Sequence, residues 1–297
     1  MNYTTFKLQI TRMLQEHFKS DAKIFIQPLT KNNNITIDGL IIQENSINIS
    51  PTLHLFSYYE DYQRGGSIEK IFKNILEDYK KRRPGQNLEL SFFTQYDLAK
   101  YHIIFKVVHY ESNRELLKRA PHFRFLDLAV VFSCLLADTP AGNATILILN
   151  NHMEYWNVTK EQLFSAAKTN TPALLPFQIH PIEELLEKMM PEAIPPEIKD
   201  KVSLYAMSNP SNLHGASALL YPEYIQDFAA AQGCDLYILP SSIHEILLMP
   251  AEDDINPQDL TVMICEVNEK HVQKDEILSY HPYYYSRKKQ EITMLCV

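Results

Sequence analysis

Residues 236–250 read LYILPSSIHEILLMP, two apolar runs on either side of a Pro-Ser-Ser turn. Short apolar runs separated by turn-forming residues are typical of an antiparallel β-hairpin. A helix is predicted to follow, with Asn256 as its N-cap, Pro257 as its first residue and apolar side chains on one face at Leu260, Met263, Ile264 and Val267. The sequence therefore predicts a hairpin followed by a helix over residues 235–270.

Residues 202–232 carry the same landmarks in the same order. The pairs Leu-Tyr, Pro-Ser, Leu-His and Leu-Leu and the final Pro of residues 204–222 correspond to Leu-Tyr, Pro-Ser, Ile-His, Leu-Leu and Pro of residues 236–250. Two extra residues in each arm preserve the side-chain alternation, because the period of a strand is two. A helix over residues 222–232 with Gly233 as its C-terminal cap is predicted to follow. We therefore expect an α+β fold with antiparallel sheets and helices packed on one face, its C-terminal part a duplicated hairpin-helix unit.

The first hundred residues show both helical and strand periodicity. The predicted elements are an amphipathic helix over residues 1–18, short antiparallel strands in 23–27 and 35–49 with turns at 32–34 and 38–39, and a helix from Ile68 that ends before Pro84. Together they indicate a strand meander between two helices.

The middle of the chain is predicted to be mainly helical. Apolar residues at helical spacing between Leu98 and Val108 favour one helix, and the nearly continuous apolar run 125–136 favours a second helix, buried on several sides. Residues 145–149 are expected to form a buried strand. Thr159 followed by Gln162 is a capping box and predicts the start of a further helix.

Six prolines lie between Thr171 and Pro196, interrupted by one short helical pattern. Clustered prolines stiffen a connector and remove backbone donors. We therefore expect an N-terminal α+β region over residues 1–171, a Pro-rich connector with one short helix over 172–199 and a C-terminal α+β region over 200–297.

Composition excludes several classes of function. The net charge is −8, with 28 basic and 36 acidic residues, so nucleic acid is not an expected partner. The longest apolar stretch is too short to cross a bilayer, and no secretory signal is recognised, so we expect a cytoplasmic protein outside the membrane. The four cysteines are far apart and no glycine-rich phosphate loop occurs. We therefore expect reduced thiols, no metal and no cofactor.

Four segments resemble a known family in their order and spacing: residues 126–132 (LDLAVVF), 142–145 (GNAT), 239–245 (LPSSIHE) and 266–268 (EVN). They resemble an uncharacterised family of bacterial cytoplasmic proteins classed as a domain of unknown function, over roughly residues 24–287. The resemblance implies a bacterial cytoplasmic home and one shared architecture. It carries no activity over to any residue.

The two predicted turns supply the candidate site. Its residues are Ser211, His214, Ser241, Ser242, His244 and Glu245. If the two units packed side by side in one sheet, His214 and His244 would lie at the same edge and could frame a shared site. A hydroxyl nucleophile needs an imidazole base and a carboxylate to orient it, but Glu245 points away from its neighbour His244 in an extended arm, and no GxSxG elbow occurs.

A non-catalytic binding or regulatory protein is therefore the leading hypothesis, and the alternative is a hydrolase that uses Ser241 or Ser242 with His244. The alternative requires a serine within hydrogen-bonding distance of His214 or His244 inside a pocket. Tyr283, Tyr284 and Tyr285 offer either an aromatic surface for another protein or an aromatic edge strand.

Overall fold

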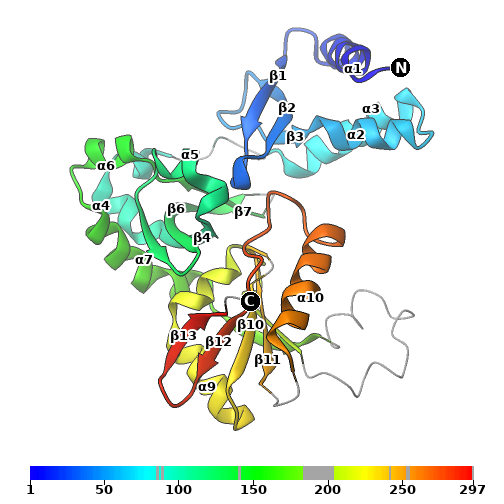
Figure 1. The fold of residues 1–297 in the computed structure, drawn as a ribbon. Helices are drawn as coiled ribbons and strands as arrows, with labels where there is room; N and C mark the ends of the chain where they lie inside the picture. The colour runs from blue at the N-terminus through cyan, green and yellow to red at the C-terminus, as the bar shows by residue number, and fades with distance from the viewer. Residues whose placement is uncertain are drawn as a thin grey trace. The chain divides into compact units, whose positions relative to one another are not determined.

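The structure is a computed structural model that describes residues 1–84, 87, 90–139, 142–182, 204–240, 242–251 and 255–295. The chain divides into two compact units, whose elements are labelled in Figure 1. Unit 1 comprises Met1–Thr94 with Leu136–Ala144, and unit 2 comprises Gln95–Leu135 with Thr145–Val297. The fold class is α+β with three antiparallel sheets, as the sequence predicts.

Unit 1 is built around a three-stranded antiparallel sheet in the order β1-β2-β3. Its elements are α1 (Tyr3–Phe18), β1 (Ala22–Thr30), η1 (Asn32–Asn34), β2 (Thr36–Glu44), β3 (Thr52–His54), α2 (Leu55–Gln63) and α3 (Ile68–Arg82). Helices α1 and α3 confirm the two predicted helices. Both have side-chain N-caps, since Asn2 accepts from the Thr5 amide and Ser67 from the Lys70 amide. Buried side chains of all three helices and all three strands form one core.

The strand pairing of unit 1 corrects one predicted turn. Asp38 and Gly39 lie inside β2, where Gly39 is opposite both Gln27 and His54. The chain reverses earlier, at η1, because Asn33 and Asn34 adopt left-handed backbone conformations with φ of 59° and 57°. Asparagine tolerates this region, so the asparagine run alone makes the hairpin.

Unit 2 begins with a four-stranded sheet in which β6 pairs with β4, β5 and β7. Its elements are α4 (Tyr96–Ala99), η3 (Lys100–His102), β4 (Ile103–His109), η4 (Glu111–Asn113), α5 (Arg114–Leu117), β5 (His122–Phe125), β6 (Leu128–Thr139), β7 (Gly142–Leu147), α6 (Asn150–Trp156) and α7 (Lys160–Leu174). The last residues of β6 and the first residues of β7 belong to unit 1.

Two helix predictions are wrong here. Residues 103–109 form β4 instead of the second half of a helix, and the apolar run predicted as a buried helix is the strand β6. The run Leu128–Leu136 is buried throughout. A strand that is covered on both faces loses its polar alternation, so periodicity cannot separate it from a buried helix. Strand β7 overlaps the strand expected at 145–149.

The predicted helix after Thr159 is confirmed as α7, and its capping box is present. It is fastened to β4 by Thr171, whose Oγ1 accepts a hydrogen bond from the Phe105 amide at 2.9 Å. Pro172 lies inside α7. The last turn of α7 therefore falls within the stretch 172–199 expected to be a connector, and residues 183–199 of that stretch, with most of its short helical pattern, lie outside the described residues.

The remainder of unit 2 is a six-stranded antiparallel sheet in the order β13-β12-β10-β11-β9-β8. Its elements are β8 (Gln178–Pro181), β9 (Tyr205–Ser208), η5 (Gly215–Leu220), α9 (Pro222–Gln232), β10 (Leu236–Leu239), β11 (Ile246–Pro250), α10 (Pro257–Lys270), β12 (Tyr283–Ser286) and β13 (Glu291–Met294). Helices cover both faces rather than one. Helix α10 packs on the face of Tyr237 and Leu239, and α9 contacts the other face through Phe228 against Tyr205.

The hairpin predicted at 236–250 is confirmed, since β10 pairs with β11 and α10 follows. The hairpin predicted within residues 204–222 is wrong, whereas the helix predicted at 222–232 with Gly233 as its cap is confirmed as α9. The expected second arm of that hairpin is the 3₁₀-helix η5, and β9 pairs with β8 and β11 instead. The small residues Gly215–Ala218 are fully buried and pack more closely than a strand of branched side chains would allow. The duplication is therefore not confirmed.

Candidate functional site

The loop after β9 is shaped by one side chain, Asn209. Its Oδ1 accepts from the amides of Ser211 and Leu213 at 3.1 and 3.3 Å, and its Nδ2 donates to the Leu213 carbonyl at 2.8 Å. Such asparagine-centred turns leave following residues free to adopt left-handed conformations. Asn212 and His214 do so, with φ of 47° and 51°. As a result Ser211 is exposed at the loop tip while His214 turns inward and is 4% exposed.

The connection between β10 and β11 is fixed by a neighbouring segment, residues 276–279. Ser242 forms a β-bridge with Ile277, and the Ile243 amide donates to the Glu276 carbonyl at 2.9 Å. The Oγ of Ser242 accepts from the backbone N–H of His244 at 3.1 Å. Ser241, the other predicted serine, lies outside the described residues. This anchoring orients His244 and Glu245.

The structure brings the two predicted histidines together. The rings of His214 and His244 lie nearly parallel, with centroids 6.4 Å apart and an interplanar angle of 19°. The Nδ1 atom of each ring is buried without a hydrogen-bonding partner. The two loops also touch through Gly215, where a Cβ atom would lie 2.2 Å from the His244 carbonyl oxygen, so only glycine fits there.

Burial dominates the charge state of His214. Desolvation, with smaller contributions from Lys106 and His244, holds the pKa of His214 well below its usual value. On the other side of the stack, His244 Nε2 lies 3.6 Å from Glu276 Oε1. His214 is therefore neutral at pH 7. In a neutral imidazole one ring nitrogen is a hydrogen-bond donor and the other is an acceptor.

Glu245 faces away from the histidine stack and into a pocket, which we call the Glu245 pocket. Its walls are Gln178, His180, Ala206, Ser208, Asn209, Pro210, Asn212 and Glu245, and its volume is about 260 Å³. The strand register explains this convergence, because Gln178 is opposite Ser208, and Glu245 directly precedes the Ile246–Met207 pair. Residues opposite one another share a face of the sheet.

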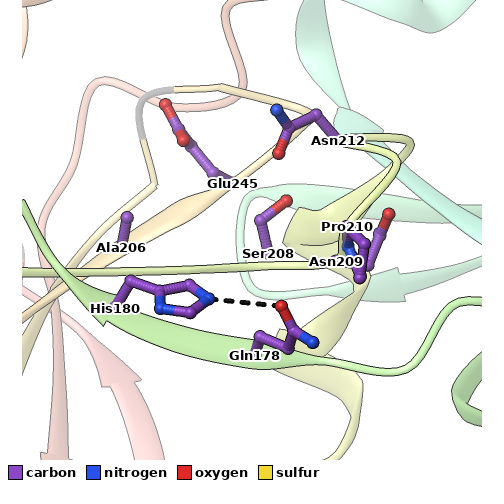
Figure 2. A pocket seen from close by; sticks show the side chains of 8 residues that line it. All are labelled: Gln178, His180, Ala206, Ser208, Asn209, Pro210, Asn212 and Glu245. Carbon is purple, nitrogen blue, oxygen red and sulfur yellow. Dashed lines mark hydrogen bonds between the residues drawn. The ribbon is translucent and has the colours of Figure 1, made fainter. Parts of the chain in front are cut away.

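Figure 2 shows the arrangement of the polar groups around the Glu245 pocket. The carboxylate of Glu245 and the amide of Asn212 lie on one side, His180 and Gln178 on the other, and the Ser208 hydroxyl between them. His180 Nε2 lies 3.2 Å from Gln178 Oε1. Burial raises the pKa of Glu245, with Glu276 adding to the effect and His244 opposing it.

The geometry required by the hydrolase alternative is not found among the described residues. Ser242 bonds to the backbone of His244 rather than to its imidazole, whose Nδ1 has no partner. Ser211 lies at an exposed loop tip. The described residues also contain no group of three or more His, Cys, Asp or Glu side chains placed to hold a metal ion.

The predicted aromatic surface is wrong for two of its three tyrosines. Tyr283 and Tyr285 are 0% and 1% exposed in β12, which is an inner strand next to β13 rather than an edge. Tyr284, on the opposite face, donates its hydroxyl to Asp235 at 2.7 Å. An aromatic strand is confirmed, but its rings serve the core because a strand with neighbours on both sides buries its alternate residues.

Sequence reasoning missed a buried polar cluster around Asp127. Its two carboxylate oxygens accept hydrogen bonds from Tyr283 and, at 2.6 Å, from Ser279. His109 Nε2 lies 4.0 Å from the same carboxylate, and its Nδ1 lies 2.7 Å from the Ser112 hydroxyl. The available signal was an acidic residue inside an apolar run. Because hydroxyl donors occupy both carboxylate oxygens, the cluster joins β6 to β12.

The chain is thus an α+β protein with antiparallel sheets and a small pocket near one sheet edge. No described helix has the length and apolarity needed to cross a bilayer. A family model described as a family of unknown function (DUF5688) matches residues 3–287, and the chain belongs to that family. No curated protein and no solved structure matches the chain.

Proposed function

We propose that the chain is a non-catalytic binding protein whose ligand is a small polar molecule held in the Glu245 pocket. One observation carries the proposal: three segments distant in sequence place neutral hydrogen-bonding groups and one carboxylate around the same cavity of about 260 Å³. Ligand sites are commonly concave, with a few convergent polar groups and a titratable group of shifted pKa.

The polar groups that line the pocket differ in how fully they are used. Asn209 is committed to its own loop by three hydrogen bonds. The Ser208 hydroxyl donates to the His244 carbonyl at 2.7 Å, which leaves its oxygen able to accept. The pocket therefore presents both donors and acceptors to a ligand.

The sequence also favours binding without catalysis, and the proposal places the binding site in the Glu245 pocket. A cytoplasmic setting is part of the proposal, because Cys134, Cys234 and Cys265 are free thiols, which are typical of a reducing compartment. Catalysis is not proposed, since no described hydroxyl at this site contacts an imidazole that could act as its base.

A fragment screen tests the proposal directly. Small polar compounds would be screened by ligand-observed NMR against the wild type and against Gln178→Trp, which places a large ring at the exposed wall of the pocket. The matched control is Thr293→Trp, an exposed position on β13 at the opposite edge of the same sheet. We expect compounds that bind the wild type and the control but not Gln178→Trp. Binding that ignores Gln178→Trp, or no binding by any compound, would overturn the proposal.

A further inference from the structure

Glu245 is a half-buried carboxylate that the described residues leave without a hydrogen bond or an ion pair. Two other carboxylates of unit 2 are paired: Asp127 accepts two hydroxyls, and Asp235 accepts the Tyr284 hydroxyl and the Arg287 amide. Taking a carboxylate out of water without a partner is costly. The same desolvation disfavours the charged form of Glu245 and is the main cause of its raised pKa.

The charges around the pocket select among possible ligands. No lysine or arginine is among the residues that line it, and the titratable groups near Glu245 are His244 and Glu276, with His180 on the facing wall. An anionic ligand would meet a carboxylate and no permanent positive charge. A purely apolar ligand would leave Glu245, Ser208 and Asn212 desolvated and unpaired. A cationic group is the one charge type that offsets the burial of Glu245.

The remaining walls indicate the rest of the ligand. Gln178, Ser208 and Asn212 are neutral groups that recognise hydroxyls or amides, and Figure 2 shows Asn212 beside Glu245, Ser208 in the middle and Gln178 on the facing wall. We propose that the ligand is a small hydroxylated primary amine whose ammonium group pairs with Glu245 and whose hydroxyls contact these neutral groups. The inference rests on the proposed function and specifies the ligand class of the same site.

A matched pair of probes isolates the charge. D-Glucosamine and D-glucose differ at one position, an ammonium in place of a hydroxyl, and both are small enough for a cavity of about 260 Å³. Binding would be measured by calorimetric titration and by two-dimensional NMR of the full chain. The variant Glu245→Gln keeps the shape of the side chain and removes its charge. The control Glu266→Gln removes an exposed carboxylate on α10 that is not among the pocket walls.

We expect the wild type and Glu266→Gln to bind glucosamine at least about tenfold more tightly than glucose, because a charge-assisted pair is worth about 1.5–3 kcal/mol. In Glu245→Gln this preference should disappear, while the weak affinity for glucose stays the same. Retained folding of the variant would be checked by its NMR spectrum.

Each other outcome is decisive. Equal affinity for both sugars in the wild type overturns the amine proposal and leaves pocket binding intact. If Glu245→Gln still prefers glucosamine, the amine proposal is also overturned, because a group other than Glu245 then recognises the ammonium. If neither sugar binds while neutral or anionic fragments do, the ligand class is wrong and the proposed function stands; if nothing binds the pocket, both fail.

Discussion

At the scale of single residues, the buried imidazole of His214 makes stability depend on pH. Its pKa in the folded chain is far below the value of about 6.5 of an unfolded chain. Below pH 6.5 the imidazole of residue 214 is therefore protonated in the unfolded chain but stays neutral in the folded chain. The stability is fully present above pH 6.5 and is lost as the pH falls. The neighbouring Lys106 and His244 also lower the pKa of His214, in addition to burial.

We expect a loss of about 1.4 kcal/mol in the free energy of unfolding between pH 7.5 and 5.5 from this one residue. Replacing His214 by Asn, which tolerates the left-handed backbone at φ 51°, should remove that part of the pH dependence. The control is His271→Asn at an exposed position. Urea unfolding at both pH values measures the effect. If the wild type and His214→Asn lose the same free energy of unfolding between pH 7.5 and 5.5, another group is responsible.

At the scale of elements, α7 contains a proline whose effect is repaired by another segment. Pro172 has no N–H to donate to the carbonyl of Lys168, four residues earlier. The hydroxyl of Tyr221 donates to that carbonyl at 3.0 Å instead, and to the Ala167 carbonyl at 3.3 Å. Burial raises the pKa of Tyr221 to about 12, so the hydroxyl remains a donor throughout the physiological range.

Tyr221→Phe should therefore lower the free energy of unfolding by about 1–2 kcal/mol, because it leaves a partly buried carbonyl unsatisfied. In a Pro172→Ala background the loss should be smaller, since the alanine amide can take over the Lys168 carbonyl. Tyr205→Phe is the control, as no hydrogen bond of its hydroxyl is found among the described residues. A double-mutant cycle by chemical denaturation tests this. If Tyr221→Phe lowers the free energy of unfolding equally in both backgrounds, its hydroxyl does not compensate for the missing amide of Pro172.

The edge of the six-stranded sheet at β8 is also shaped by a proline. The Ile182 amide donates to the Leu204 carbonyl, so residues 182, 180 and 178 point their backbone groups toward β9. The backbone nitrogen of Pro181 therefore points outward from the sheet, where it has no N–H to donate to an additional strand. A short edge strand with a proline at this position resists the addition of another strand.

The elements that sequence could predict are those with local signals. Helices α1, α3 and α7 have an apolar face and a side-chain cap, and both signals are contained within one helix. The sequence predicts helices in place of strands β4 and β6, because burial on both faces removes the alternation that identifies a strand. The 3₁₀-helix η5 was missed because small buried residues carry neither periodicity.

The candidate site was predicted in part, and for a reason that the fold corrects. His214 and His244 meet, yet not as equivalent positions of two hairpins: one follows β9 in a left-handed conformation and the other precedes β11. Glu245 was assigned to the opposite face from His244, and this alternation is what directs it into the pocket. The wall of Gln178 and His180 could not be predicted, because nothing local links β8 to residue 245.

At the scale of the whole molecule, the predicted boundary within residues 172–199 stays a prediction, and limited proteolysis of the full chain tests it. The first part of the stretch is held in α7 and β8, so we expect cleavage within residues 183–199, where Pro191, Pro195 and Pro196 have no backbone N–H to donate. The two fragments should still elute together in gel filtration, because β8 pairs with β9 and Tyr221 bonds to α7 across the stretch.

The fragments should separate in denaturant, which gel filtration in urea would show. Fragments that part under native conditions would mean that residues 200–297 fold as an independent region. Resistance to cleavage throughout residues 172–199 would remove the boundary altogether.

The Asp127 cluster imposes an order on the making of this protein. Ser279 and Tyr283 follow Asp127 by 152 and 156 residues, so a growing chain presents the carboxylate long before its two hydroxyl donors have been synthesised. The strand β6 cannot be buried beside an unsatisfied carboxylate without cost. Residues 1–94 hold most of unit 1 and can collapse while synthesis continues. Burial of β6 beside a satisfied Asp127 therefore waits for residues 279–283, and until they are synthesised we expect this apolar strand to stay exposed to aggregation.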